Sequence, residues 1–183
     1  MKIQETKLGG CYLIDHDKNE DQRGFLNRIF CQKTLSPILK GKSIRQINRT
    51  FTSKEGVVRG LHFQNPPFAE IKIVSCIKGE VWDVAVDLRK GSPTFLHYYA
   101  VNLSENNPRC FFIPEGFAHG FQTLTPNCEM LYFHTDDYNI ESEEAINSAD
   151  PLISIKWPKF ITEKSERDNN HPMLDKNFSG IEI

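Results

Sequence analysis

The feature that most constrains the fold of this chain is a recurrence of short apolar runs, each closed by turn-forming residues. The runs are rich in Val, Ile, Phe and Tyr, which favour β-strands, and Gly, Pro, Asn and Asp separate them. They read IKIVSCIKG, EVWDVAVDLR, TFLHYYAVNL, RCFFIP and EMLYFHT. This pattern predicts an all-β protein of mainly antiparallel strands, folded as a sandwich or a barrel.

Alternation and helix signals refine this prediction. In VWDVAV, successive side chains should point to opposite faces of the sheet, with Trp82, Val84 and Val86 on one face and Val81, Asp83 and Ala85 on the other. Helices are expected only around TLSPILKG and in TEKSERDNN, where the threonine is placed to cap the helix. The 183 residues contain no repeat, linker or shift in composition, so we expect one domain that spans residues 1–183.

Charge and cysteine usage limit the possible partners and the compartment. The 22 basic and 24 acidic side chains nearly cancel, which argues against a general affinity for nucleic acid or for membranes. MKIQETKLGG lacks the apolar core of a signal peptide, and no segment is long enough to span a bilayer. The five cysteines are scattered and form no C-x-x-C pair, as is typical of reduced thiols. We therefore expect a cytoplasmic protein.

Two histidines stand in motifs similar to the metal-binding motifs of the cupin jelly rolls. If GLHFQ is a strand, His62 and Gln64 share one face. In PEGFAHGF, the proline and glycine predict a tight turn that delivers His119. A metal-binding cupin supplies three imidazoles and a carboxylate. Here Gln64 is a poor ligand, and the ammonium of Lys72 would repel a divalent cation, so we predict no metal.

Such a pocket suits proton abstraction from a carbon next to a carbonyl group. A neutral imidazole is a good general base near neutral pH, and a lysine ammonium stabilises a developing enolate. No cofactor is needed, because the ketone of the substrate accepts the electrons. A second proton donor, Tyr132 or Tyr138, would turn abstraction into epimerisation. The other histidines are interpreted as hydrogen-bonded core or surface residues: His16, His97, His134 and His171.

Eight short stretches between about Asp21 and Leu174 form a specific series. They read DQRG, RQINRT, GVVRGLHFQNPP, KGEVWDVAVDLRKGSPTF, IPEGFAHGF, LYFHTDDY, DPLISIKWP and SERDNNHPML. In this order they resemble the sugar-nucleotide 3,5-epimerase family. The resemblance implies a cupin jelly roll with a few short helices. It also implies an isomerase that acts at C3, C5 or both of a nucleotide-linked 4-keto-6-deoxyhexose.

The resemblance implies a role for each matching position. His62 matches the catalytic base, Asp168 the aspartate that pairs with this base, and Tyr132 the acid. A carboxylate beside the base fixes its tautomer and stabilises the imidazolium. Lys72, expected to hold the enolate oxygen, matches a pocket residue around the sugar. The positions that match other substrate contacts are His119 and Tyr138 in the pocket, Arg59 at the pyrophosphate, and Gln46 and Asn48 at the nucleotide end.

Two arginines bear on the oligomeric state and on the nucleotide. Arg23 matches a phosphate contact that family members present to the neighbouring subunit, which implies a homodimer with shared sites. Where this chain has Arg28, the family commonly has a glutamate that accepts the thymine N3–H in dTDP-using enzymes. Arginine only donates hydrogen bonds, and it suits the acceptors of guanine or cytosine. We therefore hypothesise a nucleotide other than dTDP.

Several alternatives remain open. The loop NRTFTSKEG and the stretch YFHT depart from the family pattern at the pocket edge, so C3, C5 or both are possible sites of epimerisation. The rival functions are a metal-dependent cupin, a sugar-nucleotide 3,4-ketoisomerase on the same barrel, and a jelly roll that only binds a nucleotide sugar. The combination of His62, Tyr132 and Asp168 argues against a pure binder, which needs neither a base nor an acid.

Overall fold

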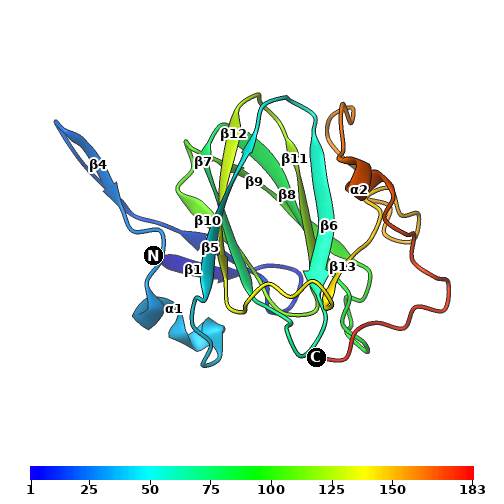
Figure 1. The fold of residues 1–183 in the computed structure, drawn as a ribbon. Helices are drawn as coiled ribbons and strands as arrows, with labels where there is room; N and C mark the ends of the chain where they lie inside the picture. The colour runs from blue at the N-terminus through cyan, green and yellow to red at the C-terminus, as the bar shows by residue number, and fades with distance from the viewer.

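Two antiparallel sheets face each other in the computed structural model, which describes residues 1–183 (Figure 1). The larger sheet has the order β1 (Lys2–Glu5), β2 (Tyr12–Asp15), β10 (Arg109–Ile113), β7 (Lys72–Lys78), β12 (Cys128–His134) and β5 (Gln46–Thr52). The smaller sheet has the order β13 (Glu143–Ala145), β6 (Val58–Gln64), β11 (Phe117–Thr123), β8 (Glu80–Asp87) and β9 (Tyr98–Ser104). This sandwich confirms the all-β prediction.

The core has three layers because most strands are apolar on both faces. A cluster between the sheets joins Val74 and Phe111 of the larger sheet to Ala85 and Phe121 of the smaller one. A second cluster covers the outer face of the smaller sheet, and a third packs the outer face of the larger sheet against the helix near residue 35. The predicted alternation in β8 is confirmed: Val81 and Ala85 belong to the inner cluster, and Val84 and Val86 to an outer one.

The strands β6 and β11 approach each other closely where they carry the two motif histidines. His62 and His119 are direct cross-strand partners, and the register shifts just after His119. A Cβ on Gly60 would lie 2.6 Å from the Cα of Gly120, so no side chain fits at this crossing. Leu61 and its neighbours on the outer face pack away from the interior, which confirms the predicted face shared by His62 and Gln64.

Both expected helices are present. Helix α1 (Gln32–Leu39) contains the TLSPIL stretch, and α2 (Glu166–Asn169) is a single turn within TEKSERDNN. The expected threonine cap is wrong, because α2 begins later than that residue. Ser165 is the N-cap, and its Oγ accepts a hydrogen bond from the backbone N–H of Asp168 at 3.0 Å. Neither helix has the length and apolar composition needed to cross a membrane.

A hairpin of β3 (Lys18–Asp21) and β4 (Gly24–Asn27) projects from the sandwich (Figure 1). Its tip exposes two apolar side chains, Phe25 at 61% and Leu26 at 69%. All five cysteines have free thiols, and four of them are buried.

Candidate active site

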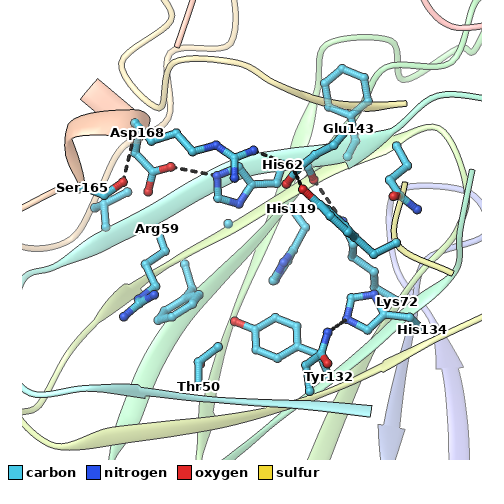
Figure 2. Close-up of a pocket in the computed structure, with 18 of the residues that line it drawn as sticks. Thr50, Arg59, His62, Lys72, His119, Tyr132, His134, Glu143, Ser165 and Asp168 are labelled. Carbon is cyan, nitrogen blue, oxygen red and sulfur yellow. Dashed lines mark hydrogen bonds and ion pairs between the residues drawn. The ribbon is translucent and has the colours of Figure 1, made fainter. Parts of the chain in front are cut away.

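The two sheets enclose a cavity of about 500 Å³, within the size range of small-molecule sites (Figure 2). Strands β5, β7 and β12 supply one wall, β6 and β11 the other, and α2 closes one side. The predicted site residues that line this cavity are Gln46, Asn48, Arg59, His62, Lys72, His119, Tyr132, Tyr138 and Asp168. Sequence segments up to 122 residues apart, from Gln46 to Asp168, thus meet at one site.

Arg23 and Arg28 do not line the cavity of their own chain. Arg23 lies in the turn of the projecting hairpin, where its guanidinium is paired with Asp21 at 2.6 Å. Arg28 follows β4 directly and is exposed. Within one chain, neither arginine therefore contributes to the site.

His62 is hydrogen-bonded to a buried carboxylate. Its Nε2 lies 2.8 Å from Oδ1 of Asp168, whose side chain is only 5% exposed. Burial alone would raise the pKa of Asp168, but the hydrogen bond and charge of His62, helped by the Gly60 N–H, hold that pKa below its ordinary value. Asp168 therefore remains a carboxylate at neutral pH. Because Nε2–H donates to it, Nδ1 carries the lone pair of the neutral imidazole.

His119 has its own carboxylate, which the sequence analysis did not assign. Its Nε2 lies 2.9 Å and 3.0 Å from the two carboxylate oxygens of Asp83. Burial is complete for Asp83 and raises its pKa, which the nearby His119 only partly offsets. The alternation in β8 predicted that Asp83 shares a face with Val81 and Ala85, and the structure turns this face inward. A carboxylate among apolar residues was therefore the available signal for this pair.

Lys72 shares a buried acidic partner with a second histidine. Its Nζ lies 3.3 Å from Oε1 of Glu70 and donates a hydrogen bond to the carbonyl oxygen of His62 at 3.2 Å. The other oxygen of Glu70 accepts from Nδ1 of His134 at 2.9 Å. Burial opposes ionisation of Glu70, but the hydrogen bond from His134 and the charge of Lys72 lower its pKa overall. The site therefore contains a cluster of Lys72, Glu70 and His134, in which the Lys72 ammonium is paired with a carboxylate.

Tyr132 is buried among rings on the wall opposite His62. The centroid of its ring lies 5.8 Å from that of His119, in an edge-to-face arrangement. It lies 6.1 Å from that of His134, and these two rings are stacked. Burial, with a smaller contribution from the charge of Asp83, raises the pKa of Tyr132 well above that of a free phenol. The phenol is therefore protonated at neutral pH and available as a donor.

Polar side chains surround the mouth of the cavity. Tyr138 donates its hydroxyl to Glu143 at 2.8 Å, and Glu143 also pairs with Arg167 at 2.6 Å. Arg59 is anchored by Thr52 at 3.0 Å.

Three further side chains of the cavity lining also make polar contacts. Gln46 bonds the carbonyl of Asp136 at 3.1 Å, and Asn48 lies 3.4 Å from Nε2 of His134. Gln64 uses both ends of its amide on backbone groups, at Phe68 and Asn139. Gln64 therefore holds a loop in place, and its amide is not free to act as a ligand.

The four other histidines are core or surface residues, as expected, but two of them also lie at the site. His97 is exposed, and His16 is buried against Cys110. His134 is buried and lines the cavity, and Nε2 of His171 lies 3.1 Å from the same carboxylate as His62. Tyr132 and His134 are two residues apart on β12, so strand alternation was the signal that predicts a shared face.

One cluster offers the donor types of a metal site. His62, Asp168 and His171 each place one nitrogen or oxygen within 4.8 Å of the others. Hydrogen bonds between the two imidazoles and the carboxylate already account for this approach. The cupin-like set of His62, Gln64, Lys72 and His119 contains an ammonium, paired with Glu70, and an amide bound to the backbone. It is not a ligand set for a divalent cation.

Comparisons with known proteins identify the family that shares this fold. The family model of dTDP-4-dehydrorhamnose 3,5-epimerase matches residues 5–176. The curated enzyme of that name from Salmonella typhimurium is 45% identical over 96% of this chain and 97% of its own length.

Two solved structures agree with this match. The dTDP-4-dehydrorhamnose 3,5-epimerase of Elizabethkingia anophelis has a TM-score of 0.91 and 38% identity, covering 97% of this chain and 98% of its own. The dTDP-6-deoxy-D-glucose-3,5-epimerase of Legionella pneumophila, in complex with dTDP-4-keto-L-rhamnose, has a TM-score of 0.90 and 36% identity, covering 100% of this chain and 98% of its own. On sequence, fold and extent of overlap, this chain belongs to the dTDP-4-dehydrorhamnose 3,5-epimerase family of isomerases, with a cupin fold.

Proposed function

We propose that the protein epimerises C3, C5 or both of a nucleotide-linked 4-keto-6-deoxyhexose, with His62 as base and Tyr132 as acid. The observation that carries the proposal is their separation. His62 belongs to the smaller sheet and Tyr132 to the larger one, and both line the cavity between the sheets (Figure 2). A sugar held between the sheets meets the imidazole on one face and the phenol on the other. Inversion requires this arrangement, because the proton leaves from one face and returns to the opposite face.

The proposed reaction needs only the residues of the chain. Nδ1 of His62 takes the proton from the carbon beside the C4 ketone, and the C–H electrons move onto the ketone oxygen. Lys72 stabilises this enolate oxygen, and Asp168 stabilises the new imidazolium. The hydroxyl of Tyr132 then gives its proton to the same carbon from the other face while the enolate electrons re-form the ketone. Transfer of one proton from the imidazolium to the phenolate, through solvent, restores both groups.

The nucleotide part of the substrate is proposed to lie toward the mouth of the cavity. Arg59 is a guanidinium suited to phosphate oxygens, and Gln46, Asn48 and Tyr138 supply polar and aromatic surface beyond it. The similarity to a relative solved with a dTDP-sugar supports a nucleotide sugar as substrate. Arg28 still argues for guanine or cytosine in place of thymine, because a guanidinium cannot accept the thymine N3–H. Calorimetric titration with dTDP, GDP and CDP tests this, and a clear preference for dTDP would reject the hypothesis on Arg28.

We infer that the protein is a homodimer in which the hairpin of one chain reaches the site of the other. The hairpin carries Arg23, and its exposed Phe25 and Leu26 need a cover. The edge strand β5 offers a matching apolar surface, with Ile47 at 58% and Phe51 at 52% exposed.

Light scattering after gel filtration tests the dimer. The wild type should have twice the chain mass of 21.1 kDa, and the substitution Phe25→Asp should shift it toward the monomer. A wild-type monomer would reject the shared site.

We also propose a cytoplasmic location, since the cysteines are free thiols.

Deuterium exchange separates this function from its rivals. In D₂O with a 4-keto-6-deoxyhexose nucleotide, NMR should show deuterium at C3, C5 or both, with inversion at the labelled carbon. A 3,4-ketoisomerase would instead move the ketone, and a pure binder would give no exchange. A metal-dependent cupin would lose activity on chelation and regain it with a divalent metal. His62→Ala should abolish exchange, and undiminished exchange in this variant would reject the base assignment.

A further inference from the structure

Asp168 receives two imidazoles on a single oxygen. Nε2 of His62 lies 2.8 Å and Nε2 of His171 lies 3.1 Å from Oδ1 of Asp168. The two rings meet edge to face, with their centroids 5.4 Å apart and an interplanar angle of 85°. A pair of base and carboxylate accounts for the contact of His62 with Asp168 but not for the contact of His171 with the same oxygen.

We propose that His171 is a positioning residue that moderates the basicity of His62 by sharing its carboxylate. The inference rests on the proposed function of His62 as the base. A carboxylate that accepts one hydrogen bond presents its full charge to that donor, whereas a carboxylate that accepts two is partly neutralised toward each. His62 consequently holds a proton less tightly than it would with Asp168 alone. More of the enzyme then carries a free base at neutral pH.

His171 donates to Asp168 as a neutral imidazole. Burial lowers its pKa first, and the charge of His62 lowers it further, while Asp168 acts in the opposite direction. The other charged group of α2 that faces it is Arg167. Arg167 is itself paired with Glu143 of β13 at 2.6 Å, so it brings little net charge to the triad.

The segment that carries His171 is fixed to the sheet. The side-chain amide of Asn147, just beyond β13, donates to the carbonyl oxygen of His171 at 3.2 Å and to that of Asn169 at 3.3 Å. The backbone N–H of Asn147 donates to the carbonyl of Pro172 at 2.9 Å. The imidazole itself is only 11% exposed. His171, which does not line the cavity, therefore approaches Asp168 from a segment that Asn147 holds by three hydrogen bonds.

The test is the pH dependence of His62 in two variants. His171→Leu keeps apolar bulk but removes the donor, and His171→Gln keeps an N–H near the same position. In His171→Leu, the acid limb of kcat/KM should move to higher pH by about half a unit to one unit, the size expected for one lost hydrogen bond to the shared carboxylate. In His171→Gln, it should stay near its wild-type position. His97→Leu, which removes an exposed imidazole outside the cavity, is the matched control and should not move it.

NMR titration of the His62 imidazole measures the same change in the His62 pKa, and it needs no catalytic turnover. The inference can therefore be judged even if the proposed epimerase activity is absent, because an inactive protein still reports the His62 pKa. A His62 pKa that stays in place or falls in His171→Leu would overturn the proposal. An equal upward shift in both variants would also overturn it, since loss of packing alone, not loss of the donor, would then explain the effect.

Discussion

Replacing Asp168 by Asn should shift the pH dependence of His62 in the direction opposite to removal of His171. If the amide oxygen takes the place of Oδ1, it still accepts from both imidazoles, and the NH₂ group faces the Gly60 N–H, where the long hydrogen bond of 3.4 Å that Asp168 accepts is lost. The shape of the side chain at position 168 and the tautomer of His62 are then preserved, and only the negative charge of Asp168 is lost. The imidazolium formed on His62 loses an anion whose nearest oxygen is 2.8 Å away.

The expected magnitude follows from that distance and from the partial burial of the pair. His62 is 33% exposed and Asp168 is 5% exposed, so an effective dielectric between those of water and the dry interior applies. At a charge separation of about 4 Å this gives about 3–4 kcal/mol. The loss corresponds to roughly a 10²- to 10³-fold fall in kcat. The acid limb of kcat/KM should move to lower pH, because protonated His62 is no longer stabilised.

Solvent deuterium exchange at several pH values measures both effects, and thermal unfolding provides the control. The folded-state pKa of Asp168 is depressed, so its contribution to stability is present above its ordinary pKa and is lost as the pH falls. Asp168→Asn should therefore be somewhat less stable at neutral pH yet fully folded. A kcat within about threefold of wild type, or an acid limb that moves upward, would refute the assignment of Asp168 as the charge partner of the base.

Three further predictions concern other parts of the site and the core. Tyr132→Phe should retain part of the deuterium exchange while inversion falls by at least about tenfold, which NMR of the product resolves. Glu70→Gln should lose about 1–3 kcal/mol of stability at neutral pH. Because the pKa of Glu70 is depressed, this difference should shrink as the pH falls below about 4.5, and urea unfolding at both pH values checks it. Phe111→Ala removes a fully buried ring between the sheets and should cost about 3–5 kcal/mol, whereas Phe160→Ala, at a ring that is 86% exposed, should cost little.

Local pattern was sufficient to predict the strands and which of their residues share a face. The alternation in β8 and in GLHFQ holds because a strand turns its side chains with a period of two, independently of what it packs against. The all-β fold was predicted from the recurring apolar runs and the family from eight ordered stretches, and the comparisons confirm both. The prediction that the threonine caps α2 was wrong, because the start of a helix depends on backbone geometry. Ser165, three residues later, has the geometry of the N-cap.

The partners of the polar residues could not be predicted in the same way. Glu70 meets His134 from a segment 64 residues away, and Asp83 meets His119 across 36 residues. These pairs depend on which strands are neighbours and in which register, and sequence alternation specifies neither. His171 was overlooked because it follows the last turn of helix and belongs to no strand, so no periodicity marks it.

The three histidines that line the cavity each pair with a carboxylate, and they differ in which ring nitrogen remains free and in how exposed the imidazole is. These two differences together favour His62 as the proposed base. His134 donates through Nδ1 to Glu70, and its Nε2 already lies 3.4 Å from the amide of Asn48. His62 and His119 both donate through Nε2, which leaves Nδ1 free in each. Their side chains are 33% and 6% exposed, respectively, so only the first is open enough for a carbon acid to approach closely. His119, with a free nitrogen but little access, is better suited to accept a hydrogen bond from a sugar hydroxyl than to take a proton from carbon. Its replacement by Gln should therefore raise KM more than it lowers kcat, the reverse of what is expected for His62.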